Sequence, residues 1–223
     1  MSDYSCFDII GPVMVGPPSS HTAGAVRLGR FARSLTDGMP TFVDIQLHGS
    51  FAETYKGHGT DLAIISGLLG MDTDDVRIKD AYQLAEEAGL NYTITRIDLG
   101  DEHHANTVRF IMKDKHGDEK TVTGCSVGGG KIKIIELDNF EVDIEGEYPT
   151  IIDTHLDQPG AINQITGILA NHKVNIASMR VFRQVKRTVA YMVIETDEIV
   201  SQNVIDEMLD TGVVVDVKFI NPF

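Results

Sequence analysis

The chain has 223 residues, of which 42% are hydrophobic and 23% are charged, and its formal net charge is −14 at pH 7. This length and composition are typical of a water-soluble protein with one or two domains. A surface this acidic repels phosphate backbones, so nucleic acid is not expected as a partner.

Membrane and secretory segments are not expected either. No apolar run approaches the roughly 18 residues that a membrane-spanning helix requires. The first residues show no basic stretch followed by an apolar core, which a signal peptide would have. The sequence therefore predicts a cytoplasmic protein without membrane contact.

The two cysteines, Cys6 and Cys125, exclude several kinds of metal site. They form no CxxC pair and belong to no Cys/His cluster with zinc-site spacing. A cubane iron–sulfur cluster takes up to four thiolates, so this chain cannot hold one unaided. Both thiols are expected to lie inert in the core.

The first 140 residues combine short strands with helical stretches, which predicts an α+β domain. Strands are expected over residues 6–10, 42–48, 92–97, 107–112, 120–123 and 131–137, with a hairpin turn at 116–118. Helices are expected along an apolar face from Ala25 to Leu35 and over residues 61–70 and 81–89. Asp80 and Gly89 are suited to begin and end the last of these helices.

The start of the first helix is a candidate anion site. Ser19 or Ser20 is its expected N-cap. The exposed N–H groups of such a helix end, together with the helix dipole, suit a carboxylate or a phosphate.

Three short motifs in this domain place a histidine beside small or turn-forming residues. They are Gly16-Pro-Pro-Ser-Ser-His-Thr22, Gly57-His-Gly-Thr-Asp61 and His104-Ala-Asn-Thr107. A histidine at a helix start or strand edge is accessible and can exchange protons near neutral pH. Taken singly, each is more commonly a solvated loop histidine or a capping partner. The run Gly128-Gly129-Gly130-Lys131 lacks Walker spacing and leads into a strand, so it is not a phosphate loop.

The pattern changes after the acidic stretch 141–147. Strands are expected over 148–155, 175–186, 187–195 and 213–220, and helices from Pro159 and over 200–209. The first helix carries the apolar stripe Ile162, Ile165, Ile168 and Leu169, with Asp157 as its expected N-cap. The order βαββαβ predicts a ferredoxin-like domain over residues 148–223.

A ferredoxin-like fold alone implies no function, but two segments of this domain resemble the ACT family of ligand-binding regulatory domains. They are His155-Leu-Asp-Gln-Pro-Gly160 and His172-Lys-Val-Asn-Ile-Ala177. The resemblance implies that His155, Asp157 and Asn175 line an amino-acid site, usually across an interface between two copies, and hence ACT-mediated self-association. The alternative is that Asp157 only caps the helix and Asn175 only makes a turn.

The three histidine motifs, followed by an ACT-like domain, resemble the β subunit of the iron–sulfur-dependent bacterial L-serine dehydratases. Residues 1–140 also resemble the allosteric substrate-binding domain of some phosphoglycerate dehydrogenases. The sequence departs from the family pattern at Pro18 and Ala105, which usually read Ser and Pro. Neither change removes a side chain with an assigned role, although both affect the loops.

The resemblance to the dehydratases implies a heteromeric enzyme that converts L-serine to pyruvate and ammonia. A separate α subunit would hold the 4Fe-4S cluster, and this chain would contribute side chains to the shared active site. The implied catalytic residues are His21, His58, Thr60, His104 and Asn106, while Ser19 and Ser20 would bind the substrate carboxylate. The alternative is a non-catalytic regulatory subunit that senses L-serine or another amino acid through its ACT domain.

Overall fold

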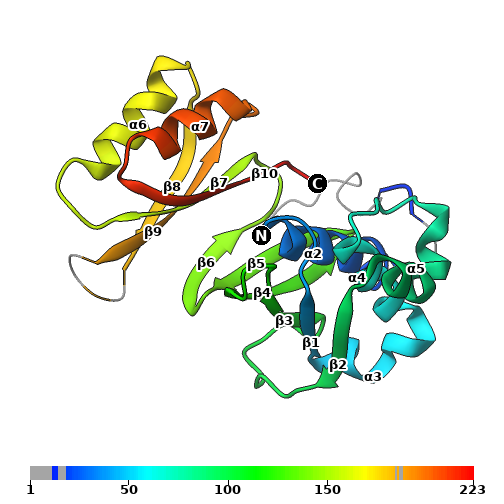
Figure 1. Ribbon diagram of the computed structural model, residues 1–223. Coiled ribbons are helices and arrows are strands. Elements are labelled where there is room, and N and C mark those ends of the chain that lie inside the picture. The colour runs from blue at the N-terminus through cyan, green and yellow to red at the C-terminus, as the bar shows by residue number, and fades with distance from the viewer. Residues whose placement is uncertain (1–11, 15–18, 184, 186–187) are drawn as a thin grey trace. The chain divides into compact units, whose positions relative to one another are not determined.

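The computed structural model describes residues 12–14, 19–183, 185 and 188–223. The chain divides into two compact units, one ending at Glu145 and the other beginning at Gly146 (Figure 1). Each unit combines helices with a sheet of largely antiparallel strands, so the predicted α+β class is confirmed. The strand expected over 6–10, Cys6 and most of the loop before Ser19 lie outside the described residues.

The first unit is built on a six-stranded mixed sheet. Its strands, in spatial order, are β2 (Asn91–Arg96), β1 (Phe42–Leu47), β3 (Thr107–Lys113), β4 (Glu119–Gly128), β5 (Lys131–Leu137) and β6 (Phe140–Ile144). Among the strands that the structure describes in this unit, only β1 and β2 pair in parallel, because the chain between them crosses over through helices. Every strand predicted within the described residues is present.

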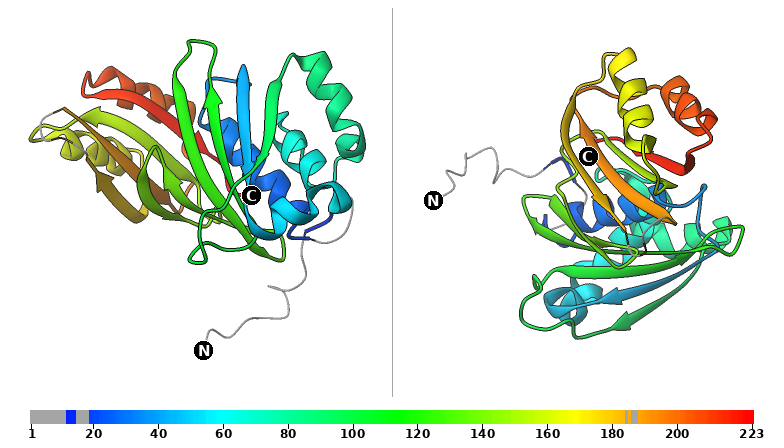
Figure 2. Two further views of the ribbon diagram at one scale, coloured as in Figure 1. Left: turned by 90° about the horizontal axis from the view of Figure 1, so that it is seen from below. Right: turned by 90° about the vertical axis from the view of Figure 1, so that its left-hand side faces the viewer.

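Helices cover one face of this sheet. They are α2 (Ala23–Ser34), α3 (Gly49–His58), α4 (Thr60–Leu68), the short 3₁₀ helix η1 (Val76–Asp80) and α5 (Ala81–Ala88). Helix α2 packs against β4, β5 and α4, as Figure 2 shows. The crossing of α2 and α4 is very close: a Cβ added to Gly29 would lie 2.4 Å from the carbonyl oxygen of Ile64.

The two faces of the sheet differ in polarity because side chains alternate along each strand. In β1, Val43, Ile45 and Leu47 are fully buried, while Asp44 and Gln46 lie on the other face and bond to each other at 2.7 Å. The buried face therefore forms the core with the helices.

Several local predictions differ from the structure. Thr22, rather than Ser19 or Ser20, occupies the N-cap position of α2, and its side chain makes no capping bond. Helix α3 was not predicted, because it buries only Phe51 and Ala52 and so lacks an apolar stripe. The acidic stretch after residue 140 was placed between domains, yet its first residues pair with β5 as strand β6.

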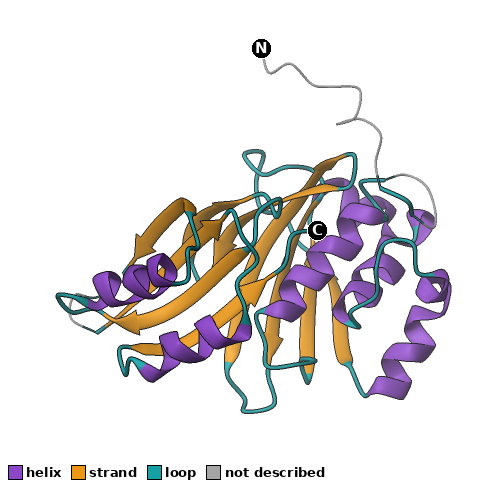
Figure 3. Cartoon of the chain, turned by 90° about the horizontal axis from the view of Figure 1, so that it is seen from above, coloured by secondary structure: helices purple, strands orange, loops and turns teal. Residues whose placement is uncertain are grey.

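The second unit has the predicted βαββαβ order. Its antiparallel sheet runs β10 (Val214–Ile220), β7 (Thr150–Leu156), β9 (Val189–Thr196), β8 (Ile176–Phe182). Helices α6 (Ala161–Asn171) and α7 (Gln202–Asp210) complete the ferredoxin-like arrangement (Figure 3). None of the helices in the described part of the chain is long and apolar enough to cross a membrane.

The core of this unit lies between the sheet and its two helices. Helix α6 contributes Ala161, Ile165, Ile168 and Leu169, which pack with residues of β7, β9, β10 and α7. Ile162, which was predicted on the same stripe, is 39% exposed because it falls at the edge of the helix face. The predicted N-cap Asp157 is also wrong: Gly160 occupies that position, in a left-handed conformation.

Candidate functional site

The histidines of the first two motifs lie next to each other. His21 directly precedes the N-cap of α2, and His58 is the last residue of α3. Their ring centroids are 4.8 Å apart with an interplanar angle of 87°. Gly59 makes this possible, because its left-handed conformation (φ 69°) ends α3 and starts α4 within a single residue. The structure thus brings together two motifs that lie more than 30 residues apart.

His21 is held in place by two hydroxyl groups. Its Nδ1 lies 3.1 Å from Oγ of Ser20, and its Nε2 lies 3.3 Å from Oγ of Ser50. The side chain also packs edge-on against Phe51, with ring centroids 5.1 Å apart. Burial and the neighbouring charge of His58 lower the pKa of His21, and the bond to Ser50 only partly offsets them. The ring is therefore neutral at pH 7 and able to accept a proton.

The third motif lies against the same turn of α3. The backbone N–H of Phe51 donates to the carbonyl of Ala105 at 3.3 Å, so residues 104–106 are neighbours of Ser50. The backbone N–H of Asn106 donates to Nδ1 of His104 at 3.1 Å. His104 is exposed and Asn106 is half-buried, which leaves both side chains accessible.

Thr60, the remaining predicted residue of the His-Gly-Thr motif, is fully buried at the start of α4. Its hydroxyl has no hydrogen-bond partner among the described residues. A hydroxyl buried without a partner destabilises the fold, typically by about 1–3 kcal/mol. Such groups are rare in proteins and commonly mark a functional site.

Several residues of this region are not among the predicted site residues. Ser50 contacts His21, and His48, at the end of β1, accepts the backbone N–H of Leu99 on its Nδ1. The ring of His103 lies 6.3 Å from that of His48. A signal was available for Ser50, because His48-Gly49-Ser50 repeats the His-Gly-hydroxyl pattern of His58-Gly59-Thr60.

The described residues do not fit an iron–sulfur cluster or another metal centre. They contain no group of three or more His, Cys, Asp or Glu side chains arranged to hold a metal ion. Cys125 is buried in β4, and burial raises the pKa of its thiol, which disfavours the thiolate that a cluster needs.

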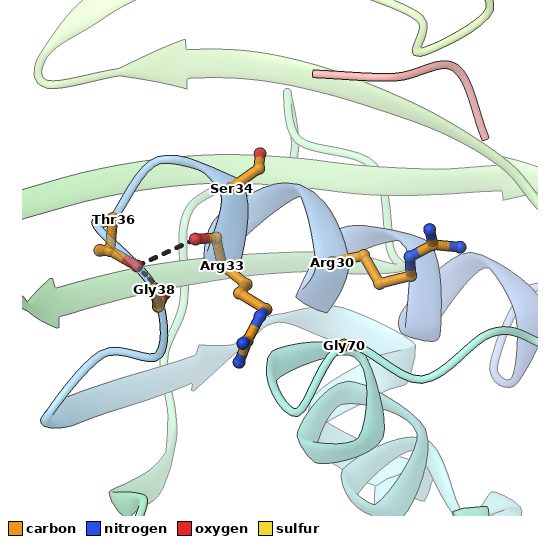
Figure 4. Close-up of a pocket in the computed structure, with 6 residues that line it drawn as sticks. All are labelled: Arg30, Arg33, Ser34, Thr36, Gly38 and Gly70. Carbon is orange, nitrogen blue, oxygen red and sulfur yellow. Dashed lines mark hydrogen bonds between the residues drawn. The ribbon is translucent and has the colours of Figure 1, made fainter. Parts of the chain in front are cut away.

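A separate hollow of about 340 Å³ lies near the other end of α2, lined by Arg30, Arg33, Ser34, Thr36, Gly38 and Gly70 (Figure 4). Arg33 donates to the carbonyl of Leu68 at 2.8 Å, and Arg30 pairs with Asp72. The Thr36 hydroxyl donates to the carbonyl of Arg33. Arg33 and Thr36 thus bond to carbonyls at the ends of α4 and α2, and the hollow lies at the end of α2 opposite to His21.

The three residues predicted to line the ACT site each have a different partner. His155 is buried in β7, and its Nδ1 lies 2.7 Å from Oδ1 of Asp153. Asp157 accepts a bond from Arg183 at 3.3 Å, before α6. Asn175 follows α6, and its side-chain amide donates to Asp197 at 2.6 Å. Asp157 and Asn175 are thus at opposite ends of α6, which is about 16 Å long.

Comparison with known proteins identifies both units. A model described as the serine dehydratase beta chain matches residues 5–100, and a model of the ACT domain matches residues 150–212. The chain is 41% identical over 198 residues to the L-serine dehydratase beta chain of Peptoniphilus asaccharolyticus, covering 89% of each protein. The chain belongs to the serine dehydratase beta chain family.

Two further relatives agree with this assignment. A probable L-serine dehydratase beta chain of Bacillus subtilis strain 168 is 47% identical over 208 residues, covering 93% of this chain and 94% of the relative. A D-3-phosphoglycerate dehydrogenase of Synechocystis is 27% identical over 185 residues, covering 82% of this chain but only 33% of that protein. The family resemblance predicted from the motifs is confirmed.

The lowered pKa of His21 can be tested directly. An NMR titration of the histidine rings should give His21 a pKa below 6.5, its ordinary value. Burial is the main cause, and the charge of His58 adds to it, so His58→Gln should raise the pKa of His21 without restoring the ordinary value. The exposed His116, in the hairpin after β3, provides the control: His116→Gln should leave His21 unchanged. A pKa of His21 at or above 6.5 in the unmodified chain would contradict the geometry.

The buried Asp153–His155 pair predicts a pH-dependent stability. Burial raises the pKa of Asp153, and the bond to His155 only partly offsets it. The folded state then favours the protonated carboxyl, so this group's contribution to stability is present at low pH and is lost as pH rises through the raised pKa. Asp153→Asn should therefore raise the melting temperature relative to the unmodified chain increasingly as pH rises above about 4.

The matched control for this prediction is Asp216→Asn on the neighbouring strand β10, where the carboxyl is 40% exposed. Its melting-temperature difference from the unmodified chain should vary little with pH. Calorimetry of both variants between pH 4 and 8 makes the comparison. A pH-independent difference for Asp153→Asn would show that the carboxyl is not held protonated by burial.

Proposed function

We propose that this chain supplies one side of the active site of an L-serine dehydratase and acts only in complex with an α chain that holds a 4Fe-4S cluster. The enzyme class and the partner follow from the names of the two beta-chain relatives, at 41% and 47% identity over most of the chain. The absence of a set of cluster ligands among the described residues is compatible with a cluster in the partner.

The convergence of the three histidine motifs carries this proposal. His21 and His58 contact each other, and residues 104–106 border the turn of α3 that holds Ser50. A purely regulatory subunit has no need for a buried neutral histidine beside an exposed one. We therefore favour the enzyme subunit over the non-catalytic amino-acid sensor.

In this proposal the chain's side chains bind the substrate and move a proton. Ser19 and Ser20 lie before α2, where the positive end of the helix favours a substrate carboxylate. His21 is neutral at pH 7 and oriented by Ser50, so it can accept a proton within the site. The ring of His58 lies against that of His21, and Thr60, His104 and Asn106, from the same motifs, would complete the polar lining. L-serine would lose its α-proton and hydroxyl, and hydrolysis of the resulting enamine would yield pyruvate and ammonia.

The ACT domain would regulate this reaction by binding L-serine or another amino acid between two copies. Asp157 and Asn175 lie at opposite ends of α6, so a small amino acid cannot touch both residues of one copy. A second copy could bring its Asn175 to the Asp157 of the first. Strand β8 is at the edge of the sheet, with Met179 and Val181 about 40% exposed, which suits self-association through this edge.

Reconstitution of the complex tests the proposed activity. The purified chain alone should be colourless and inactive on L-serine, whereas anaerobic co-expression with an α chain should yield pyruvate. Within the active complex, His21→Ala, His58→Ala and His104→Ala should each lower turnover by about 10²-fold or more, the magnitude of a lost acid–base group.

The control is His116→Ala, which changes an exposed histidine at the far end of β3. It should keep unmodified turnover, and all variants should still bind the α chain. A brown chromophore with stoichiometric iron in the isolated chain would contradict the proposal that the α chain holds the cluster. If the three motif variants keep the turnover of the unmodified complex, these histidines have structural rather than catalytic roles.

The ACT proposal predicts an effect on regulation rather than on chemistry. Asp157→Ala or Asn175→Ala should change the serine concentration dependence of the complex, including any sigmoidal behaviour or lag. The maximal rate should stay within about threefold, because what is lost is coupling free energy on the order of 1–3 kcal/mol. Steady-state and progress-curve kinetics measure both quantities. If both variants keep unmodified kinetics, the ACT domain serves assembly only.

A further inference from the structure

Two buried hydroxyl groups at the first turn of α2 stand out, because neither meets a hydrogen-bond partner among the residues that the structure describes. They belong to Thr22, the residue before the helix, and to Ser126 in β4, with exposed fractions of 4% and 0%. Neither oxygen has a hydrogen-bond partner within the described part of the chain. Because buried polar groups in proteins are nearly always paired, two such donors at one helix end point to a ligand.

Ser126 is held firmly, and only its hydroxyl is unused. Its backbone N–H donates to the carbonyl of Asn106 at 3.0 Å, and the side-chain amide of Asn106 donates to its carbonyl at 3.4 Å. The third histidine motif therefore fixes the position of Ser126. The hydroxyl points at the helix: a Cβ added to Gly24 would lie only 2.0 Å from Oγ of Ser126. Glycine at this position leaves room for the hydroxyl.

Thr22 occupies the N-cap position but does not act as a cap. Its backbone has φ −112° and ψ −75°, whereas a capping residue is usually extended, and its side chain makes no bond to the helix. The hydroxyl is therefore available at the positive end of a helix of 12 residues. The hydroxyls of Thr22 and Ser126 and the N–H groups at this helix end are together called the niche. Such a set of donors favours an anion.

The chemistry of the niche favours a carboxylate over a phosphate. The nearby Arg27 is already engaged, because its guanidinium donates to the carbonyl of Gly130 at 2.7 Å. The niche thus offers neutral donors, which suit the single charge and two oxygens of a carboxylate. A carboxylate bound beside Thr22 also lies next to His21, the preceding residue.

We propose that Ser126 and Thr22 donate hydrogen bonds to the carboxylate of the bound amino-acid substrate. This inference rests on the proposed function and adds Ser126, which lies in none of the histidine motifs, to the substrate-binding residues. Ser20, expected to serve this purpose, has its Oγ 3.1 Å from Nδ1 of His21 and so contributes to orienting that ring.

The test uses Ser126→Ala in the complex with the α chain. Loss of a hydrogen bond to a charged group should raise KM for L-serine about 10- to 100-fold, with kcat within about threefold. The melting temperature of the variant chain should not fall, because the hydroxyl that is removed makes no bond to any residue that the structure describes. Thr22→Val, which removes the other hydroxyl at nearly constant volume, should act in the same way.

Inhibitors identify the substrate group concerned. In Ser126→Ala the inhibition constant of 3-hydroxypropanoate, which has the carboxylate but no amine, should rise by the same factor as KM. That of ethanolamine, which has no carboxylate, should stay unchanged. The control is Ser66→Ala: Ser66 is equally buried, but its hydroxyl donates to the carbonyl of Leu62 at 2.8 Å. This control should lower the melting temperature and leave KM unchanged.

An unmodified KM in Ser126→Ala, or a lower melting temperature with no change in KM, would overturn the inference while leaving the proposed function intact. If the unmodified complex does not act on L-serine, the proposed function fails instead. Thermal shift with 3-hydroxypropanoate then decides about the niche. If 3-hydroxypropanoate stabilises the unmodified chain but not Ser126→Ala, the inference is supported. If it stabilises neither chain, the inference is overturned.

Discussion

The close crossing of α2 and α4 sets the distances on which the candidate site depends. A Cβ on Gly67 would lie 2.1 Å from the carbonyl oxygen of Val26, and one on Gly29 would meet α4 just as closely. Only glycines allow the two backbones to approach this far. His21 immediately precedes the N-cap of α2, and His58 stands two residues before α4. The crossing therefore brings the rings of His21 and His58, which belong to distant segments of the chain, into contact.

The site combines this rigid support with groups that are unfavourable for stability. His21 is buried with a lowered pKa, and the hydroxyls of Thr22, Thr60 and Ser126 are buried without partners among the described residues. Each unpartnered hydroxyl lowers the free energy of unfolding, and the lowered pKa of His21 lowers it at acidic pH. Together they are what a site prepared for a polar substrate requires, because donors that are already desolvated and fixed need no reorganisation when the ligand binds.

The ACT domain shows a different use of buried polar groups. Asp153 and His155 form a pair inside the face of the sheet that packs on the helices, beside the apolar cluster of the domain. By contrast, Asp157 and Asn175 are bonded near the surface, at opposite ends of α6. Of the residues that resemble the ACT ligand site, His155 is thus buried inside the domain, whereas the other two lie near its surface.

Local patterns in the sequence were sufficient for most of the secondary structure. Alternation predicted β1 and β3, and the helical stripe of Ile165, Ile168 and Leu169 predicted α6, because a regular element with one buried face must repeat its apolar residues. The His172–Ala177 segment and the three histidine motifs predicted the ACT domain and the family. The weakly amphipathic α3 lacks such a repeat and was missed. Strand β6 was also missed, although Phe140, Val142 and Ile144 alternate with Glu141 and Asp143, because its acidic residues were interpreted as the end of the domain.

Only the tertiary structure decided which polar side chains meet. Ser126 carries no distinctive sequence context, and its importance comes from its closeness to the first turn of α2. Ser50 repeats a His-Gly-hydroxyl pattern, but only the structure shows its contact with His21. The capping of α2 and α6 was predicted wrongly, because a serine or aspartate near a helix start can equally bond to another side chain. Ser20 contacts the ring of its sequence neighbour His21, and Asp157 bonds to Arg183, which folding brings close from another segment. The sequence by itself determined the elements and the family, since those depend on local periodicity and motif spacing. The geometry of the site depends on the approach of α2, α3 and β4, which are far apart along the chain.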